Sequence, residues 1–545
     1  MKKYKLVLVL TITLFVNANA QTWQWVKGGS DSCPDQVQTV CTDANGNSYI
    51  VGTFGGSFLT GCNGYMLFDS DSIWINGVNQ IFLVKYSPSG VLQWAKSIGG
   101  NNPNVGNCNN CESAISLFYD SVNNAIYLTG KLYGLATFGS TNLFGGGEMF
   151  VTRIDLNGNF IWAKLYGNYS TRAQISTDLS GNVFLSGGSN DSIYFDSIGI
   201  AAGSFWAKLD ASGNAIWAKI IAVNAGSGSL FFVGNSIYSF FGTANDTAWI
   251  DTSLFISGTP HNNILAKFDA SANIQWITSF YSNASSNFYA ALAKDAADNF
   301  YITGIFYSDI HFGATSLTSP GSSDFYLAKY DVNGNFIWVR QGNATNGAAA
   351  GTIATTADGS TYIGGGFIGN LSLGTYNISS NANPEIFIAR YTDNGDCLGA
   401  LQLGAAIPPP AIATDNSGNI FVTARFNPPN YTLGGFTLNT FGGVFIAKHD
   451  VITGIEGEGR MANNQLIIYA NPNAGKCNIT VPDDFVHEKN LTLSIYDNTG
   501  KLIQQKILEM NDGKIKLNLE AEAKGIYYVT LNNKKKFYNG KIIFE

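Results

Sequence analysis

The stretch Ser323 to Gln341, SDFYLAKYDVNGNFIWVRQ, sets the pattern for most of this 545-residue chain. Phe325 to Tyr330 alternates side chains between two faces, as a β-strand does. Phe336 to Arg340 is a second apolar run, and the residues between the runs include Asn and Gly, which tolerate a positive φ and close tight turns. The stretch therefore predicts a β-hairpin that must be covered on both faces.

Versions of this hairpin recur along the chain and align on a tryptophan in the second strand. The aligned residues are Trp25, Trp94, Trp162, Trp217, Trp276 and Trp338, with Gly399 at the seventh position. The strand before the turn also occurs seven times, as in FLVKYS (82–87) and YLAKYD (326–331). A further strand follows a DxxGN-like turn in each repeat, as in NSYIVG (47–52).

Segments such as IHFGATSLTS (310–319) and LSLGTYNISS (371–380) lie between that strand and the next hairpin. We expect them to supply a fourth strand. Four short antiparallel strands per unit, repeated along the chain, are typical of propeller blades. The units exceed the usual length of about 40 to 50 residues, which predicts longer loops on one rim.

The two ends of the repeat region complement each other. The chain begins with a lone tryptophan strand at 22–27, and the last repeat stops after FIAKHD (445–450) without one. A ring closed by this strand has no exposed terminal blade. The sequence therefore predicts an all-β chain with a seven-bladed β-propeller over 21–450. The alternative is an open β-solenoid.

The strands that follow the DxxGN-like turns resemble the SBBP-type β-propeller repeat of bacterial exported proteins. That repeat has the core D-x-x-G-N-x-[YF]-[VIL]-[TS]-G. DLSGNVFLSG (178–187) and DANGNSYIVG (43–52) fit it well, whereas 229–242 lacks the Asp and the turn. The resemblance covers about Trp25 to Asp450 and implies a fold but no activity.

The N-terminus predicts export. Lysines precede an apolar run, Leu6 to Val16, and Ala18-Asn19-Ala20 follows, as in a cleavable signal peptide over 1–20. The alternative, a transmembrane anchor, needs about 20 apolar residues, and the run is shorter. We expect no transmembrane segment in the mature chain. The formal net charge is −7 and no basic stripe occurs, so we expect no nucleic-acid partner.

Residues 451–464, VITGIEGEGRMANN, have no strand pattern and read as a linker. Residues 465–545 alternate strands with Asn-Gly-type turns, which predicts a small Ig-like β-sandwich. This run closely resembles the C-terminal sorting domain of the type IX secretion system of Bacteroidetes. The matching pieces are YANPN (469–473) with Gly475, IYDNTGK (495–501), GIYYV (525–529) and KII (541–543).

The resemblance assigns six residues to the sorting motif: Asn471, Pro472, Gly475, Gly500, Gly525 and Lys541. It implies the type IX secretion machinery as a partner and a location outside the cell, either secreted or on the outer-membrane surface. In that family the domain is a secretion address and is usually removed. An ordinary accessory β-sandwich is the alternative.

Cysteines and turn carboxylates raise the question of metals and disulfides. The chain has seven cysteines, at 33, 41, 62, 108, 111, 397 and 477, and the crowding of five in the first two repeats allows one or two disulfides whose pairing stays open. Cys108 and Cys111 lack the further ligands of a zinc site. Asp43, Asn45 and Asn47 partly mimic a calcium loop, but an Asx-type hairpin turn explains the same residues. We expect no other cofactor.

The sequence shows no catalytic constellation. Only His261, His311, His449 and His487 occur, and neither a GxSxG nor an HExxH motif is present, which argues against nucleophilic and zinc hydrolases. A glycosidase or lyase needs two carboxylates across a cleft. Asp246, Asp251, Asp309 and Asp324 are candidates that the sequence does not rank.

Two repeated features have a structural interpretation. Arg153 and Arg390 replace Lys at one position that carries a cation in every repeat. Strict repetition also places the aligned tryptophans in the core between blades. We therefore expect an exported scaffold that binds a glycan or a protein through loops, without a covalent step. The alternatives are a polysaccharide hydrolase or lyase with carboxylates at the channel, and a structural surface-layer role.

Overall fold

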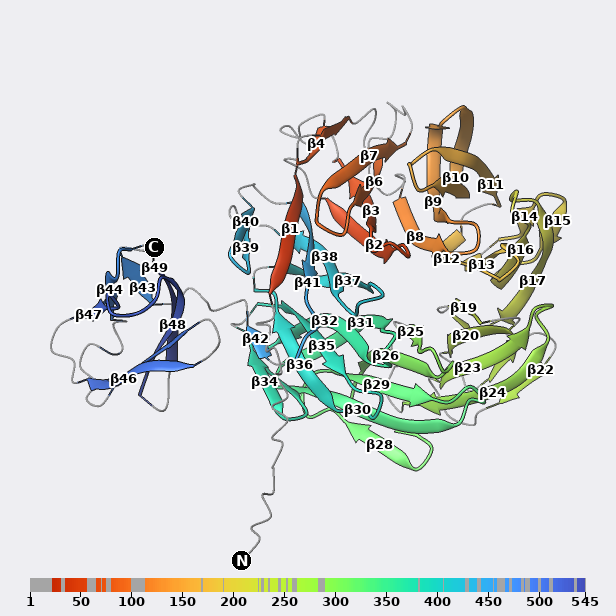
Figure 1. Ribbon diagram of the computed structural model, residues 1–545. Coiled ribbons are helices and arrows are strands. Elements are labelled where there is room, and N and C mark those ends of the chain that lie inside the picture. Colours follow the sequence, from red (N-terminus) through yellow and green to blue (C-terminus); the bar gives the residue numbers. More distant parts are fainter. Residues whose placement is uncertain are drawn as a thin grey trace, which may run out of the picture. The chain divides into compact units, whose positions relative to one another are not determined.

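The structure is a computed structural model of the chain (Figure 1). The residues that it describes are 22–30, 35–55, 65–69, 71–74, 80–99, 113–167, 170–189, 191–223, 225–226, 230–233, 236–243, 247–250, 253–256, 262–282, 290–380, 383–404, 406–426, 431–438, 443–453, 455–457, 466–469, 473–481, 485, 491–497, 501–508, 513–533 and 537–544. The predicted signal peptide lies outside these residues. So do Asp246, Asp251, His261, His487, Asn471, Pro472, Gly500 and four cysteines, at 33, 62, 108 and 111.

The chain divides into two compact units, residues 1–456 and 457–545. The regular elements among the described residues are β-strands, and these residues contain no α-helix. The all-β prediction is therefore confirmed. No helix in the described part of the chain is long and apolar enough to cross a membrane.

The described part of the first unit contains seven antiparallel sheets that share one strand order. We number them sheet 1 to sheet 7 along the chain and give the strands of each sheet from the innermost to the outermost. Sheet 1 is β2 (Gln36–Thr42), β3 (Ser48–Phe54), β6 (Gln80–Tyr86) and β7 (Leu92–Ile98); sheet 2 is β8 (Ser113–Asp120), β9 (Ala125–Phe138), β10 (Thr141–Asp155) and β11 (Phe160–Tyr166); sheet 3 is β12 (Ser170–Thr177), β13 (Val183–Ser189), β16 (Gly203–Leu209) and β17 (Ala215–Val223); sheet 4 is β18 (Ala225–Gly226) with β19 (Leu230–Val233), then β20 (Ser236–Thr243), β23 (Asn262–Asp269) and β24 (Ile274–Tyr281). Sheet 5 is β25 (Ala290–Lys294), β26 (Phe300–Phe306), β29 (Asp324–Tyr330) and β30 (Phe336–Ala344); sheet 6 is β31 (Gly347–Thr355), β32 (Thr361–Ile368), β35 (Glu385–Tyr391), β36 (Cys397–Gln402) and β42 (Ile455–Gly457); sheet 7 is β37 (Ala406–Thr414), β38 (Ile420–Phe426), β41 (Gly443–His449) and β1 (Trp23–Ser30).

The hairpin predicted for residues 323–341 forms as predicted. β29 pairs with β30 around the turn at 331–335. Phe325 and Leu327 join a cluster with Phe387 of sheet 6, whereas Tyr326 joins a different cluster with Phe280 of sheet 4. Each face of the hairpin is therefore covered by a neighbouring sheet, and burying these large side chains contributes about 1.5–3 kcal/mol each.

The predicted fourth strand is wrong. Residues 309–318 and 370–379 form hairpins of their own, β27–β28 (Asp309–Phe312, Thr315–Thr318) and β33–β34 (Asn370–Leu373, Tyr376–Ser379). The missing strand is the innermost one, as in β31, GAAAGTIAT. Its small residues give a weak strand pattern, because β propensity comes mainly from branched and aromatic side chains.

We call the inserted hairpins the outer hairpins, and four of them extend the preceding sheet. Hydrogen bonds join β4 to β1, β21 to β17, β27 to β24 and β33 to β30. The long strand β9 contacts β7, and β14 contacts β11. The other outer hairpins have these bounds: β4 (Tyr65–Phe68) with β5 (Asp71–Trp74), β14 (Ile193–Phe195) with β15 (Ile198–Ile200), β21 (Thr247–Ile250) with β22 (Ser253–Ile256), and β39 (Tyr431–Leu433) with β40 (Phe436–Leu438).

The first strand of the chain lies beside the last strands of the unit. Figure 1 shows β1, in red, next to the blue β38 and β41, and β1 pairs with β41 from Trp23 to Gly29. Thr42, at the end of β2, donates to the Thr414 carbonyl (2.7 Å), and Thr414 donates to the Thr355 carbonyl (2.9 Å). The innermost strands contact one another in sequence, and β37 contacts β2.

The first unit extends beyond the residues predicted for it. β42 lies inside the predicted linker and joins sheet 6. Ile452 is fully buried, and its N–H donates to the Tyr362 hydroxyl (3.2 Å). The Gly and charge content of 451–464 concealed this short edge strand.

The second unit contains two antiparallel sheets. They are β43 (Ile467–Tyr469), β44 (Lys476–Thr480) and β47 (Lys514–Asn518), and then β46 (Leu502–Leu508), β45 (Leu491–Asp497), β48 (Gly525–Asn532) and β49 (Phe537–Phe544). Side chains from both sheets share one core, which includes Ile479, Leu493 and Val529.

Candidate functional site

Eight aspartates among the described residues of the first unit hold tight turns in the same way. At Asp331, one carboxylate oxygen accepts from the N–H groups of Asn333 and Asn335 (both 2.8 Å), and the other accepts from the Asn335 amide (2.7 Å). The same three bonds recur at Asp43, Asp155, Asp178, Asp210, Asp269, Asp295 and Asp415. These carboxylates fix the turn backbone.

The candidate calcium loop has this geometry. Asp43 accepts from the N–H groups of Asn45 and Asn47, from the Asn47 amide (2.7 Å) and from the Tyr49 hydroxyl (2.9 Å). Among the described residues, no group of three His, Cys, Asp or Glu side chains could hold a metal ion. Protein donors thus surround the carboxylate, and calcium at this turn stays a prediction.

The repeated cation lies over an aromatic ring in every sheet. The Lys or Arg on the third strand stands opposite an aromatic residue on the second strand and is 4.9–5.9 Å from its ring centroid, a cation–π distance. The pairs are Tyr49–Lys85, Tyr127–Arg153, Phe184–Lys208, Tyr238–Lys267, Tyr301–Lys329, Tyr362–Arg390 and Phe421–Lys448. Because the same pair occurs in all seven sheets, it is a repeated structural contact and does not mark a binding site in any one sheet.

The aligned tryptophans link each sheet to the next. Trp94 donates its indole N–H to the Leu156 carbonyl (3.2 Å), which lies in the turn between the third and fourth strands of the next sheet. Trp25, Trp162 and Trp338 donate to the equivalent carbonyls at Pro88, Ala211 and Asp393 (3.0 Å each). The glycine of the same turn has positive φ and lies against the ring, as Gly334 does against Trp276.

Sheets 5 and 6 share a charged contact. Lys329 forms an ion pair with Asp393, and Asp393 also accepts from the Tyr301 hydroxyl (2.8 Å). The hydrogen bond from Lys329 is the main cause that lowers the pKa of Asp393. The three side chains satisfy one another, so this cluster offers no poised acid or base.

The other sequence candidates lie apart. Asp324 is fully buried, accepts from the Ala344 N–H and from the Gln341 amide, and has its pKa raised by burial. Asp309 lies on β27, where it binds His311 (2.6 Å between Oδ2 and Nε2). Because the two carboxylates serve different local contacts, they do not form a catalytic pair.

Buried thiols show no sign of reactivity. Cys41, Cys397 and Cys477 are unpaired, and burial raises the pKa of each, that of Cys397 to about 11. A raised pKa suppresses the thiolate that reacts or binds metal.

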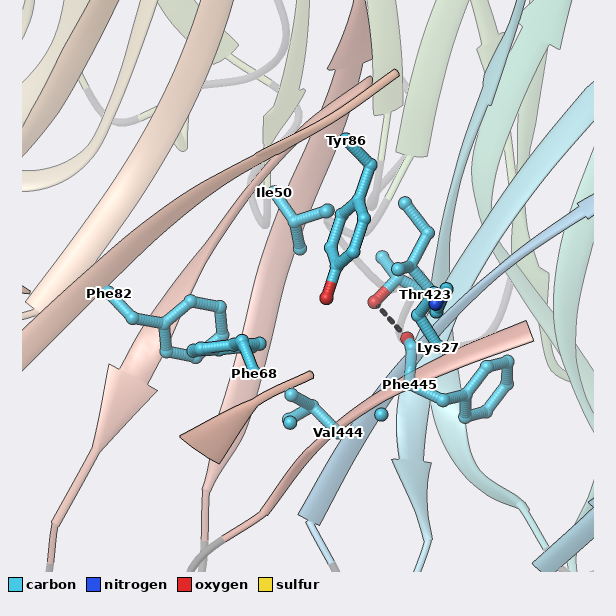
Figure 2. A pocket seen from close by; sticks show the side chains of 11 residues that line it. Lys27, Ile50, Phe68, Phe82, Tyr86, Thr423, Val444 and Phe445 are labelled. Carbon is cyan, nitrogen blue, oxygen red and sulfur yellow. Dashed lines mark hydrogen bonds between the residues drawn. The ribbon is translucent and has the colours of Figure 1, made fainter. Parts of the chain in front are cut away.

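A small cavity lies between sheets 7 and 1 (Figure 2). Ile50 and Tyr86 of sheet 1 face Thr423 and Val444 of sheet 7 across it. Its volume of about 10 Å³ is close to the room that one water needs. The cavity is therefore a packing gap and not a ligand site.

The outer hairpin β4–β5 exposes an aromatic surface. Tyr65 and Trp74 are paired across its strands, and their ring centroids are 5.3 Å apart at 54°. Trp74 is 61% exposed, although Met66 and Ile73 on the other face are buried. This hairpin is therefore packed on one face and apolar on the other.

The end of the β9–β10 hairpin repeats this arrangement. Leu135 and Phe144 are paired across the strands, and Phe144 is 74% exposed. The adjacent pair on the same face is polar, because the Thr137 hydroxyl donates to the Asn142 amide oxygen (2.9 Å). Asn142 and Phe144 are two residues apart, which is about 7 Å along a strand.

One strand of each hairpin, β5 and β9, contacts β7. The equivalent face of β33–β34 is polar, with Ser372 bonded to Asn377 (2.6 Å). Exposed aromatic side chains are thus a property of particular hairpins and not of the repeat. We call the surfaces around Trp74 and Phe144 the aromatic platforms.

Sequence reasoning missed the aromatic platforms. A signal for one was present: Trp74 is a tryptophan outside the aligned repeat position, in the alternating stretch YMLFDSDSIW (65–74). Trp23 and Trp206 are also off that position, yet both are buried. The sequence pattern alone did not separate these cases.

Of the described sorting-motif residues, Gly475 and Gly525 lie at strand ends of the second unit, and Lys541 lies within β49. The Gly475 N–H donates to the Asn473 side chain (2.8 Å), and its φ of +95° is one that few other residues adopt. Gly525 opens β48, and Lys541 pairs in register with Tyr528. The last three motif pieces are thus on neighbouring strands.

Residues 467–545 match the secretion system C-terminal sorting domain. This confirms the type IX sorting domain that the sequence resemblance predicted. A domain of this kind implies export to the cell surface or to the medium, and interaction with the type IX secretion machinery. A search of curated proteins found no match to the chain.

Similar solved structures include a protein of unknown function from Dyadobacter fermentans, with 10% identity over 62% of this chain and 94% of that one, and a TM-score of 0.33. The phage phi92 endosialidase has 10% identity over 96% of this chain and 85% of that one, with a TM-score of 0.34. A DUF4221 member from Bacteroides vulgatus has 7% identity over 78% and 97%, with a TM-score of 0.32. Likenesses at these scores do not decide between binding and catalysis.

Proposed function

We propose that the first unit is a closed seven-bladed β-propeller of SBBP-type repeats that binds a polysaccharide outside the cell. Closure is supported by the pairing of β1 with β41 and by the contact of β37 with β2. The hydroxyl bonds of Thr42 and Thr414 cross the same junction. A ring of this kind holds its outer hairpins in fixed positions, so a ligand meets a preorganised surface.

The aromatic platforms carry the proposal for a carbohydrate ligand. The face of an aromatic ring is electron-rich, and the C–H groups on a sugar ring are attracted to it. Next to Phe144, Thr137 and Asn142 supply hydroxyl and amide groups for sugar hydroxyls. Strands of both hairpins contact β7, and two exposed aromatic surfaces on one unit suit a polymer of repeated units.

The hydrogen bonds that engage the repeat carboxylates favour binding over hydrolysis. A glycosidase needs two carboxyl groups free to act on one bond. Asp43, Asp331 and their equivalents bind their own turns, and Asp324 is buried in hydrogen bonds. Binding by stacking and hydrogen bonds needs no covalent step.

Binding of the purified chain to a glycan array tests this function. We expect Trp74→Ala and Phe144→Ala each to weaken binding of the selected polysaccharide by about tenfold, because loss of one stacked ring costs about 1.4 kcal/mol. Ile337→Ala is the matched control, since Ile337 is exposed but lies on β30, away from the aromatic platforms. It should bind as the unchanged chain does.

The bound polysaccharide is then examined for chain length after incubation. Shortened polysaccharide chains would show that the protein acts as a hydrolase or lyase and not by binding alone. If no glycan binds, or if the Ile337 variant loses as much affinity as the Trp74 variant, the carbohydrate assignment is wrong and a structural surface role gains support.

A further inference from the structure

The four-stranded sheet of the second unit is packed on one face only. Leu493 and Ile495 of β45 and Val529 of β48 point into the core. On the opposite face, Ile507 is 73% exposed and Tyr528 is 44% exposed. Large apolar side chains gathered on one exposed face are typical of interaction sites.

Strand register places several of these side chains in one row. Leu502 of β46 pairs with Tyr496 of β45, Tyr496 pairs with Tyr528 of β48, and Tyr528 pairs with Lys541 of β49. Leu502 and Tyr528 are exposed, and Tyr496 is half-buried. We call Leu502, Tyr496 and Tyr528 the sorting row.

The sorting row collects separate sequence motifs. Tyr496 belongs to IYDNTGK and Tyr528 belongs to GIYYV. Adjacent strands in a sheet are about 4.8 Å apart, so the row spans about 10 Å from Leu502 to Tyr528. Motifs that are far apart in sequence therefore form one continuous surface.

The other sheet of the unit presents a different chemistry. Lys514, Lys516 and Asn518 are the exposed residues of β47, and Lys476 of β44 pairs with Glu520 (2.9 Å). Of the two outer sheet faces, as far as their residues are described, the one with the sorting row is the more apolar.

We propose that the sorting row is the surface by which a protein subunit of the secretion machinery binds this chain. The match of 467–545 to a sorting domain means that the machinery must recognise this unit. The sorting row offers that partner an apolar contact on a rigid sheet, and the exposed Ile526 lies on the same face two residues from Tyr528. This inference does not depend on what the propeller binds.

Export of the full chain in its producing bacterium tests the inference. The double variant Leu502→Thr with Tyr528→Thr removes the row, and threonine keeps the strand propensity of these positions. We expect the exported fraction to fall at least tenfold, with the chain retained in the periplasm. A chain ending at Asn464 sets the level without a sorting domain, and Lys516→Thr with Asn518→Thr is the matched control on the opposite sheet.

Retention must occur without unfolding, so protease resistance and thermal unfolding of the purified variants are compared with those of the unchanged chain. The inference is supported if the double variant is folded but retained in the periplasm, while the control variant is exported. Normal export of the double variant overturns it, and so does equal retention of the control variant. A change of oligomeric state with normal export also overturns it, because a second copy would then cover the row.

Discussion

At the scale of single residues, each repeat uses its polar groups for its own architecture. The turn at 331–335 contains an Asp whose carboxylate accepts from backbone N–H groups. It also contains a glycine that contacts the tryptophan ring of the preceding sheet. In sheet 4 the same turn position is Ala272, with a φ of +63° and full burial. A methyl group is therefore tolerated there at the expense of some backbone strain.

Gly334→Ala tests how much the tryptophan contact contributes. A Cβ at Gly334 would lie 2.7 Å from the Trp276 ring, whereas a Cβ at Gly313 would meet nothing within 4 Å. Both residues have positive φ, so Gly313→Ala should cost about 1 kcal/mol from strain alone. We expect Gly334→Ala to cost about 1 kcal/mol more, from overpacking, measured as the shift in the urea unfolding midpoint.

Equal losses for the two variants would contradict a role for the ring. Adding Trp276→Phe to Gly334→Ala makes room for the methyl group. In a double-mutant cycle, this second change should then cost less than Trp276→Phe does alone.

The turn aspartates also predict acid sensitivity. Burial raises their pKa values, but hydrogen bonds from the following Asn and N–H groups outweigh this and leave the pKa of Asp155, Asp210, Asp269 and Asp331 below the ordinary value. Unfolded aspartate has a pKa of about 3.9. The stability from these turns is thus complete above that pH and is lost as the pH falls through the lower folded pKa values.

We therefore expect the urea midpoint to be level between pH 7 and 5 and to fall between pH 4 and 2. Asp324 acts in the opposite sense, because its raised pKa favours the folded state at low pH. Asp331→Asn should reduce the acid dependence slightly without removing it. A midpoint that rises below pH 4 would show that buried carboxyls such as Asp324 outweigh the turns.

At the scale of elements, the sequence predicted what repeats and missed what varies. Alternation at Phe325 to Tyr330 and the Asn-Gly turn predicted the hairpin correctly. The innermost strand escaped notice because Ala and Gly in 347–355 carry no strand signal. Residues 310–319 alternate strongly, so the sequence pattern predicts the fourth strand of the sheet there. Their pairing with the preceding sheet depends on tertiary contacts that no local pattern encodes.

The aromatic platforms were not predicted because no local sequence pattern encodes the exposure of a side chain. Exposure decides whether a tryptophan is core or surface, and Trp23 and Trp74 differ in exposure although both are off the repeat position. The outer hairpins vary because one face of each is free of packing. Their inner faces link successive sheets, as Leu371 of β33 does when it pairs with Ala344 of β30.

At the scale of the whole molecule, the first unit depends on a strand that is distant in sequence. The Asp450 N–H donates to the Thr22 carbonyl (3.1 Å), and the Gln24 amide donates to the Asp450 carboxylate (2.7 Å). β1 also provides the edge to which β4 binds. Its contribution therefore reaches both sheet 7 and the aromatic platform around Trp74.

Deleting residues 22–30 should open the ring that we propose for the first unit. β41 would keep β38 but lose its other partner, leaving an unpaired edge that promotes aggregation. Val444 and Phe445 would also lose part of their cover. We expect the shortened chain to unfold at a lower temperature and to form oligomers, measured by thermal unfolding and light scattering. A synthetic peptide, TWQWVKGGS, should restore a monomer by strand addition.

The peptide with Trp25→Ala is the matched control for this rescue. It lacks the indole that donates to the Pro88 carbonyl and is buried between sheets 7 and 1. It should restore far less of the melting temperature, because strand pairing alone then holds the junction. Rescue must also need a high peptide concentration, since the covalent link supplies β1 at an effective concentration of about millimolar. A shortened chain that stays monomeric and melts as before would mean that the remaining strands close the ring without β1.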